Sequence, residues 1–170
     1  LTDCPAHHYG TLSYPWVYKE QFYKEGIFVR YRWYDTRKIK PLFAFGHGLS
    51  YTDFSISDVR TEKKTYASGD SIRLSCTVAN TGDFLGAEVV QVYVGKPDSR
   101  VKRPLKELKG FKKVQLPVGE SVSVDIVIPV QRLAYYEESI PGWKLEKGEY
   151  TVFVGNSSDN IIGQVTIMIR

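Results

Sequence analysis

Apolar and polar residues alternate along most of the chain after residue 53. In residues 72–79 the apolar side chains of Ile72, Leu74, Cys76 and Val78 occupy every second position, and residues 121–128 and 150–154 repeat this pattern. Successive side chains of a strand point to opposite faces, so each run is typical of a β-strand with one face in a core. Four further segments are predicted to be strands, namely 54–59, 87–94, 107–116 and 162–169.

Residues that favour turns separate these segments. Gly, Asn, Asp, Ser and Pro cluster at 68–70, 80–83, 117–120, 147–148 and 156–159. About seven short strands with such turns predict a mainly β fold, an antiparallel β-sandwich. The strands do not alternate with helical segments, which disfavours a doubly wound parallel sheet.

The first 53 residues have a different composition. They hold 13 of the 23 aromatic residues and all three histidines, and they show no sustained helical period, so we expect extended segments with turns. So many aromatic side chains on an irregular chain need a surface to bury against. We expect a preceding part of a longer protein to supply it, leaving a large apolar patch around Trp16, Phe22, Phe28 and Trp33. Packing on the sandwich, packing on another partner, or fraying are the alternatives.

Composition narrows the class of protein. Hydrophobic residues make up 42% and charged residues 25% of 170, which is typical of a globular protein. A net charge of +4 without a dominant basic block disfavours nucleic acid as a partner, and no apolar run is long enough to span a membrane. The chain starts at Leu1 and its only methionine is Met168, so we expect a processed product or a piece of a longer protein. The compartment is open, with a secreted or periplasmic location favoured over a cytoplasmic one.

Acidic residues do not form a recognisable catalytic pair. A glycosidase needs two carboxylic acids facing one sugar, but the candidates in the first part of the chain lie in no pattern that fixes a pair: Asp3, Glu20, Glu25 and Asp35. Asp125 is expected on the polar face of a strand, and residues 137–138 form an exposed acidic step. Solvated surface or local capping is the favoured interpretation of each.

Other candidate chemistry is equally incomplete. Cys4, His7 and His8 form a C-x-x-H-H cluster, but a structural zinc site takes four ligands and no second cluster follows. Residues 46–50, G-H-G-L-S, resemble a nucleophile elbow only superficially and are better explained as a turn in which glycines allow positive φ. Cys76 is expected to point into the core, and a disulfide with Cys4 is possible but unsupported. We therefore predict no catalytic, cofactor-binding or metal-binding residue and no cofactor.

Two further features have competing interpretations. The basic stretch 100–106 is interpreted as a solvated loop, with pairing to acidic groups of a neighbouring domain as the alternative. Trp16, Trp33 and Trp143 are expected in a core or an interface rather than as sugar-stacking platforms. A carbohydrate-binding module would need an exposed coplanar aromatic pair, and after residue 53 few aromatic side chains could point outward, Tyr93, Phe153 and Trp143 at best.

Four segments resemble motifs of glycoside hydrolase family 3 β-glucosidases. Residues 23–35, Y-K-E-G-I-F-V-R-Y-R-W-Y-D, are similar to the family stretch Y-x-E-G-I-x-V-G-Y-R-Y-Y-D, and residues 41–52, P-L-F-A-F-G-H-G-L-S-Y-T, to P-L-F-P-F-G-x-G-L-S-Y-T. Residues 103–114 resemble R-P-x-K-E-L-K-G-F-x-K-V, and residues 148–158 resemble the closing G-E-Y-x-V-x-V-G-x-S-S. Arg30 and Ala44 depart from the family's usual Gly and Pro.

This resemblance implies a domain organisation. Family members have a barrel domain, then an α/β sandwich domain, then a fibronectin type III-like domain of immunoglobulin-like fold. Residues 1–40 would be the tail end of the α/β sandwich domain, residues 41–52 a connector, and residues 53–170 the fibronectin type III-like domain. The partners would be the upstream barrel and α/β sandwich domains.

The resemblance also implies a function without catalysis in this chain. The parent reaction would be retaining hydrolysis of terminal non-reducing β-D-glucosides, with the β-glucoside a substrate of the parent only. The family's nucleophilic Asp lies in the barrel domain and its acid/base Glu upstream of the Y-x-E-G-I stretch, so no catalytic role passes to Glu25. The chain would be an accessory domain that stabilises the catalytic domains. A carbohydrate-binding module and a free-standing protein-interaction module are the alternatives.

Overall fold

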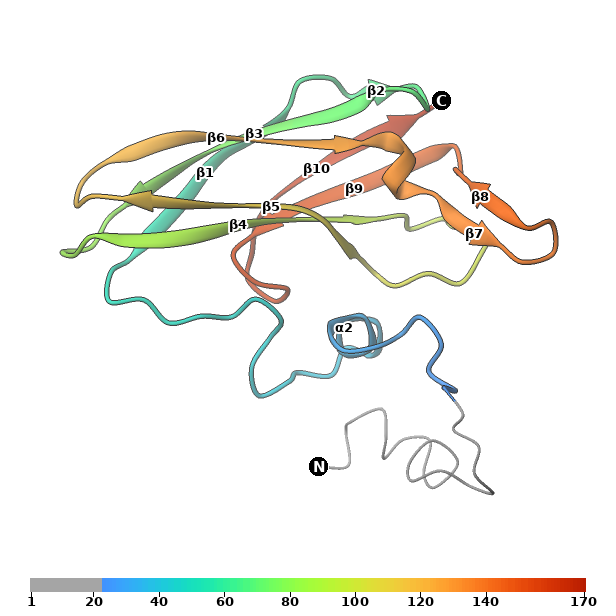
Figure 1. Cartoon of the computed structure of the whole chain (residues 1–170), viewed down its shortest axis with the longest axis horizontal. Helices are drawn as coiled ribbons and strands as arrows, with labels where there is room; N and C mark the ends of the chain where they lie inside the picture. The colour runs from blue at the N-terminus through green and yellow to red at the C-terminus, as the bar shows by residue number, and fades with distance from the viewer. Residues whose placement is uncertain (1–22) are drawn as a thin grey trace.

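The computed structural model describes residues 23–170, and most of this range is strand (Figure 1). All seven predicted strands are present, and we give their observed bounds here: β1 (Phe54–Thr61), β3 (Ser71–Asn80), β4 (Gly86–Gly95), β5 (Glu107–Leu116), β6 (Ser121–Pro129), β9 (Gly148–Gly155) and β10 (Ile161–Ile169). The prediction of a mainly β, antiparallel sandwich is confirmed.

Three short strands and a 3-10 helix were not predicted: β2 (Thr65–Tyr66), β7 (Tyr135–Glu137), β8 (Gly142–Lys144) and η2 (Val130–Leu133). Each is two to four residues long, too short for a period to show in the sequence. Strands β7 and β8 form a separate hairpin beside the main sheets.

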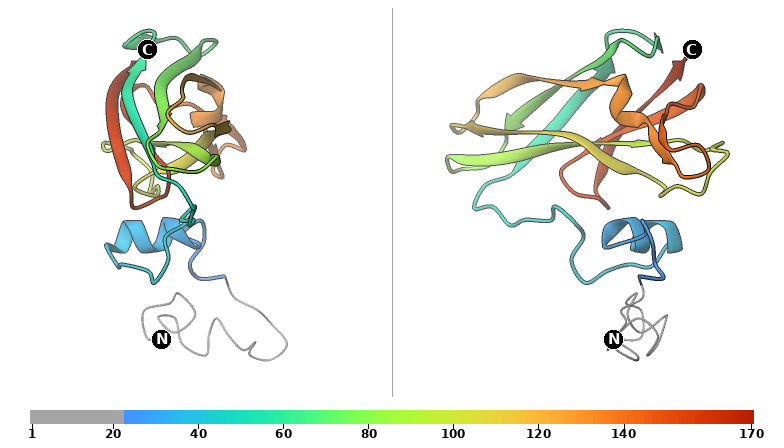
Figure 2. Two further views of the ribbon diagram at one scale, coloured as in Figure 1. Left: turned by 90° about the vertical axis from the view of Figure 1, so that its left-hand side faces the viewer. Right: turned by 45° about the vertical axis from the view of Figure 1, so that its right-hand side comes forward.

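The long strands form two layers (Figure 2). One sheet has the order β1-β3-β6, and the other has the order β2-β10-β9-β4-β5. The paired strands of these sheets run antiparallel, except for the short parallel contact of β2 with β10. Non-consecutive neighbours such as β3 and β6 are the consequence of chain crossing between the layers, as in a sandwich.

The alternating positions of the sequence form the core between the layers. On β3, Ile72, Leu74, Cys76 and Val78 are buried, which confirms the predicted inward face, and Cys76 is a free thiol. The register places Leu74 opposite Ile126 on β6, so the two strands present one apolar face. The facing sheet contributes the second half of the core with Val90, Val92, Val94, Tyr150, Val152, Val154, Ile167 and Ile169.

Part of the first segment is helical. Helix α2 (Tyr31–Arg37) follows a turn that contains Glu25, so the prediction of extended segments with turns is wrong for residues 31–37. The helix ends at Lys38, which adopts a left-handed conformation with φ 56°. At seven residues it is too short for an amphipathic period to emerge.

Helix α2 and the following chain lie along one side of the sandwich (Figures 1 and 2). Val92 and Val94 of β4 point into the core, so the alternate residues Gln91 and Tyr93 point to the outer side of the five-stranded sheet. Both are nevertheless buried. The Tyr31 ring of α2 meets the Tyr93 ring edge-on at 5.7 Å, so this segment covers the outer side of β4. Within residues 23–170, no helix is long and apolar enough to cross a membrane.

Candidate functional site

Helix α2 is attached to the start of β5 by polar contacts. The Asp35 carboxylate lies 2.7 Å from the Lys106 ammonium, and both side chains are largely buried. The hydroxyl of Tyr31, one turn earlier on the same helix face, accepts a hydrogen bond of 2.8 Å from the backbone N–H of Leu108. One face of the helix therefore carries the two groups that hold it to the sheet edge.

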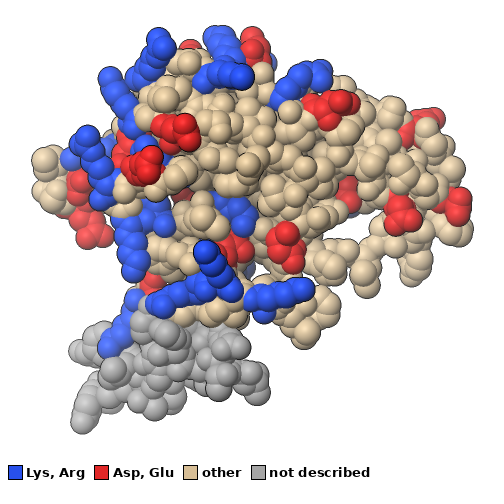
Figure 3. All heavy atoms as spheres, turned by 180° about the vertical axis from the view of Figure 1, so that it is seen from behind, with Lys and Arg blue, Asp and Glu red and all other residues tan. Residues whose placement is uncertain are grey.

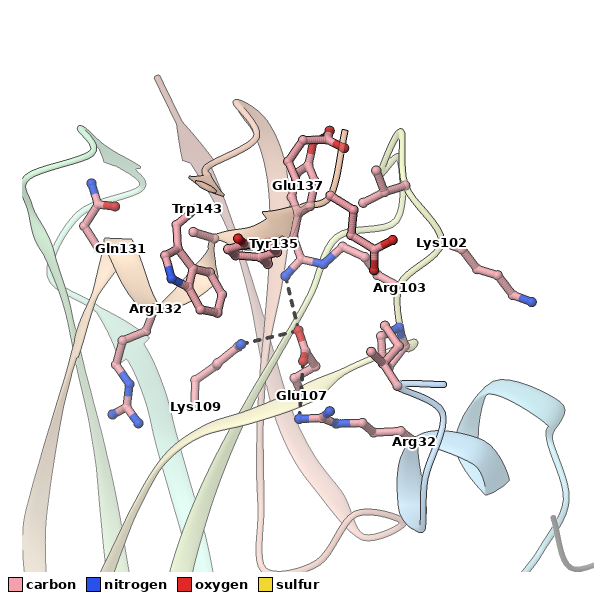
Figure 4. Close-up of a pocket in the computed structure, with 16 residues that line it drawn as sticks. Arg32, Lys102, Arg103, Glu107, Lys109, Gln131, Arg132, Tyr135, Glu137 and Trp143 are labelled. Atoms are coloured by element: carbon pink, nitrogen blue, oxygen red, sulfur yellow. Dashed lines mark hydrogen bonds and ion pairs between the residues drawn. The ribbon is translucent and has the colours of Figure 1, made fainter. Parts of the chain in front are cut away.

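Charged side chains converge on Glu107 beside this contact (Figure 4). Its carboxylate lies 3.2 Å from Arg103, 3.3 Å from Lys109 and 3.4 Å from Arg32 of α2. Arg103 also lies 3.8 Å from Glu146. The cluster thus joins the helix, the loop before β5, the strand itself and the chain before β9.

Burial and neighbouring charges act in opposite directions on these acids. Burial tends to raise the pKa of Glu107, but Lys109, Arg103 and Arg32 outweigh it and hold that pKa below its ordinary value. Asp35 has one cation beside it, and burial raises its pKa despite the opposing effect of Lys106. Glu107 is therefore the carboxylate that its surroundings stabilise in the charged form.

The basic stretch 100–106 is only partly solvated. Arg100 and Lys102 are exposed, as the interpretation of a solvated loop requires. The side chains of Arg103 and Lys106 are 9% and 8% exposed and are paired with acids, so that interpretation is wrong for them. The sequence contains one signal for this cluster, because Glu107 and Lys109 alternate on one face of a predicted strand.

Figure 3 shows the rear face, where charges of both signs intermingle. Basic side chains cross its lower part, close to the level at which α2 lies in Figure 1, and acidic side chains lie beside them. The exposed basic residues that follow α2 are Lys38 and Lys40.

Residues 41–52, the connector, hold apolar side chains in solvent. Leu42, Phe43, Leu49 and Tyr51 are 90%, 71%, 95% and 96% exposed. Single exposed apolar residues are ordinary, but four large ones within ten positions are not.

The connector is nevertheless held against the sandwich at several points. The carbonyl of Phe45 accepts a hydrogen bond of 2.8 Å from the N–H of Ser158 in the β9–β10 loop. The buried side chain of Gln91 donates to the carbonyl of Gly46 at 3.4 Å. At the far end, the Thr52 hydroxyl donates to the side-chain oxygen of Asn80 at 2.7 Å. Its exposed side chains are therefore presented from a fixed backbone.

The turn predicted at residues 46–50 lies instead at residues 44–47, where the N–H of His47 donates to the carbonyl of Ala44 at 3.1 Å, but the expected glycine with positive φ is present. Gly46 has φ 82°, a conformation that side-chain-bearing residues rarely adopt. A Cβ there would also lie 2.3 Å from the side chain of Gln91. The second glycine, Gly48, has no positive φ, so the turn needs only one of the two glycines for its conformation.

A groove of about 1010 Å³ lies between the β7–β8 hairpin, the start of β5 and the chain near α2 (Figure 4). Trp143 lines it and is 74% exposed. Arg132, Gln131 and Glu138 supply exposed polar groups around it. The groove thus combines one exposed indole ring with charged and amide side chains.

The groove does not contain the coplanar aromatic pair that a flat carbohydrate platform needs. The rings of Tyr136 and Trp143 lie 5.7 Å apart but meet at 79°, edge to face. Of the other rings considered for an outward position, Tyr93 is fully buried and Phe153 is half-buried. Tyr93 does lie on the outer side of its sheet, but Tyr31 of α2 covers it, so it cannot be part of an exposed aromatic pair.

Among the described residues, the structure does not show the apolar patch that was expected around the tryptophans and phenylalanines of the first segment. Trp33 is buried and Phe28 is half-buried, so neither forms an open apolar patch. Trp16 and Phe22 lie outside the described residues. Exposed large apolar side chains are found near Phe28, at Tyr23, Ile27 and Val29, and in the connector.

The acids considered for catalysis lie on separate elements. Glu25 lies in the turn before α2, Asp35 pairs with Lys106, and Asp125 is exposed on β6 as expected. Glu138 is exposed, whereas Glu137 is half-buried and accepts a hydrogen bond from Ser139. Asp3 and Glu20 lie outside the described residues.

The metal and disulfide candidates can be placed only in part. Within residues 23–170, no group of three or more His, Cys, Asp or Glu side chains could hold a metal ion. Cys4, His7 and His8 lie outside the described residues, and so does the Cys4 end of the disulfide considered with Cys76.

Comparison with known proteins relates the chain to one enzyme family. Residues 88–158 match the family model of the fibronectin type III-like domain. The chain is 43% identical over 98% of its length to β-glucosidase BoGH3A of Bacteroides ovatus, of which it covers 22%.

Solved structures give the same result. The chain superposes with a TM-score of 0.87 and 36% identity on DesR, a β-glucosidase from Streptomyces venezuelae solved with D-glucose, over 95% of this chain and 20% of that one. For the family 3 β-glucosidase of Bifidobacterium adolescentis the TM-score is 0.86 and the identity 39%, over 92% and 23%. The chain thus spans about a fifth of the proteins that it matches. It corresponds to the C-terminal part of family 3 β-glucosidases and contains their fibronectin type III-like domain.

Proposed function

We propose that this chain serves as the non-catalytic accessory part of a family 3 β-glucosidase, holding the catalytic domains in place. The observation that carries the proposal is its match over 98% of its own length to only 22% of a β-glucosidase. The larger remainder of such an enzyme would hold the reacting groups. The parent reaction would be retaining hydrolysis of terminal β-D-glucosides.

The proposed organisation keeps three parts. Residues 1–40 would be the end of an α/β sandwich domain, residues 41–52 a connector and residues 53–170 the fibronectin type III-like domain. The composition change near residue 53 and the start of β1 at Phe54 support the last boundary. The Asp35–Lys106 pair and the Glu107 cluster would hold the end of the α/β domain against the sandwich. The partners would be the upstream barrel and α/β sandwich domains.

In this arrangement the chain acts by positioning. A catalytic domain that ends in a helix fixed to a rigid sandwich loses freedom to move, which helps to keep reacting groups in register. No residue of this chain is assigned to acid, base or nucleophile. The charged contacts at the helix would act through orientation alone.

The test compares two proteins under identical assay conditions. The 170-residue chain should not hydrolyse p-nitrophenyl β-D-glucoside, whereas the full-length product of its gene should. Turnover by the purified 170-residue chain, or its absence from an otherwise folded full-length product, would refute the proposal.

Carbohydrate binding is a second candidate, which the exposed ring of Trp143 in the groove favours. Aromatic faces stack on sugars, and neighbouring Arg, Gln and Glu side chains can bind hydroxyls. Titration of the chain with cellotetraose should then quench tryptophan fluorescence, and Trp143→Ala should abolish the response. An unchanged spectrum at millimolar cellotetraose would refute carbohydrate binding and leave positioning as the one proposed function.

A further inference from the structure

The connector combines a fixed backbone with uncovered apolar side chains. Its carbonyls at Phe45 and Gly46 and the side chain of Thr52 are bound to the sandwich. Leu49 and Tyr51 nevertheless extend almost fully into solvent. A flexible loop could turn such side chains inward, but a loop held in its middle and at its C-terminal end keeps the side chains between these points outside.

Packing on β4 explains why these side chains do not fold back. The adjacent outer side of β4 is already occupied, because Tyr31 stacks on Phe45 at 4.9 Å and meets Tyr93 edge-on. Gln91 fills the space beside Gly46. The outer side of β4 beside Phe45 and Gly46 is therefore already covered.

We infer that Leu42, Phe43, Leu49 and Tyr51, the connector surface, dock directly on the catalytic domain that precedes this chain in its parent enzyme. The inference rests on the proposed function. It adds the connector to the contact that α2 already makes with the outer side of β4.

The occupant follows from continuity of the chain. The connector joins the segment that contains α2 to β1, and the match to solved β-glucosidases runs through it, covering 95% of this chain and 20% of DesR. Four fifths of such an enzyme would therefore lie outside this chain. Of the described residues before β1, Leu42, Leu49 and Tyr51 of the connector are the most exposed large apolar groups.

Thiol labelling tests the contact at single positions. Leu49→Cys and Tyr51→Cys would be introduced separately into a Cys4→Ser background, and Phe111→Cys, at an exposed site on β5, is the matched control. Cys76 is buried and stays in place. The rate of maleimide labelling would be measured by mass spectrometry in the 170-residue chain and in the full-length gene product.

In the 170-residue chain we expect all three thiols to be labelled at similar rates. In the full-length protein the two connector thiols should be labelled at least about tenfold more slowly, as expected for a site that reacts only when the interface opens, and the thiol at position 111 should be unchanged. Equal labelling of the connector thiols in both proteins would overturn the inference.

Two other outcomes would also overturn it. Slow labelling in the 170-residue chain that is independent of concentration would identify residues 1–22 as the cover, and slowing that increases with concentration would identify a second copy. Hydrolysis of p-nitrophenyl β-D-glucoside by the same full-length samples tests the proposed function separately. An active enzyme with reactive connector thiols would refute only the docking surface.

Discussion

The sandwich and the segment before it bury their apolar residues in different ways. In the sandwich, every second residue of a strand enters a shared core, and Leu74 is 1% exposed. In residues 23–52 the helix is fixed by ion pairs and a tyrosine hydroxyl, and Leu49 remains 95% exposed. The sandwich buries the inward apolar side chains of its strands in its own core. The segment before it leaves several large apolar side chains in solvent.

This difference indicates which part of the chain is self-sufficient. Strands β1 to β10 close a core from their own side chains, so the sandwich can fold alone. In the earlier segment Arg32 and Asp35 are paired with charges near the start of β5, but large apolar side chains of the connector are uncovered. Its sequence suits a larger assembly rather than an independent domain.

The largest expected effect comes from one truncation made in both regions. Leu74→Ala should lower the free energy of unfolding by about 2–5 kcal/mol, because it leaves a cavity in the core. Leu49→Ala should change it by less than about 0.5 kcal/mol in the 170-residue chain. Urea unfolding of the two variants measures both values. A large loss for Leu49→Ala would show that the connector packs within the chain and would break the comparison.

Next in size is the removal of the cation that holds α2. Lys106→Met leaves the Asp35 carboxylate buried without its partner and should weaken helix docking by up to about 3 kcal/mol. Hydrogen exchange should accelerate at residues 31–37 while the amides of β3 keep their protection. Lys102→Met, at an exposed position, is the control.

A double variant sharpens this result. Asp35→Asn combined with Lys106→Met removes both charges and should restore part of the protection that Lys106→Met loses. If the double variant is less protected than Lys106→Met, the ion pair is not what holds the helix.

Asn80 joins the two regions, and its loss should have an intermediate effect. Its side chain accepts a hydrogen bond from Thr52 and donates to the carbonyls of Phe84 and Leu116 at 2.7 and 2.9 Å. Asn80→Ala leaves these groups unpaired and should cost about 1–3 kcal/mol in urea unfolding. Asn160→Ala, at an exposed site, should cost much less.

The smallest expected effect is on the pH dependence of stability. The pKa of Glu107 is lower in the folded chain than its ordinary value of about 4.3. As the pH falls, its carboxylate is therefore protonated in the unfolded chain before it is protonated in the folded chain. The resulting stabilisation is complete above the ordinary pKa and is lost as the pH falls through the folded-state pKa. Thermal unfolding should therefore show a shallower acid decline in Glu107→Gln than in the parent chain.

Asp35 tests whether the direction of this pH effect is assigned correctly, because its pKa is shifted in the opposite direction from that of Glu107. Its pKa is raised in the folded chain, so its protonation in acid favours the folded state. Asp35→Asn should steepen the acid decline that Glu107→Gln makes shallower. Equal slopes in the two variants would show that at least one of the two carboxylates does not have the assigned surroundings.

The sandwich could be predicted from the sequence because its signal is local. The inward positions of β3 and β9 repeat every two residues, and glycine, asparagine or aspartate marks the turns between strands. Strand β5 was predicted with its observed bounds, Glu107–Leu116. The strands that were missed are too short to show a period.

The helix and its charged cluster could not be predicted in the same way. The contacts of Asp35 and Arg32 connect them to Lys106 and Glu107, more than 70 residues away, and nothing in the intervening sequence specifies them. Arg103 and Lys106 resemble ordinary surface cations until their partners are placed. The exposure of Leu49 and Tyr51 is likewise a property of packing and not of residue type.

The size of the native protein tests the central claim most directly. An antibody raised against the 170-residue chain would be used to blot extracts of its source, fractionated by size and assayed for β-glucosidase. We predict a band several times larger than 19.4 kDa that co-elutes with the activity. A lone band near 19.4 kDa, separate from that activity, would contradict the assignment as an accessory part of a β-glucosidase.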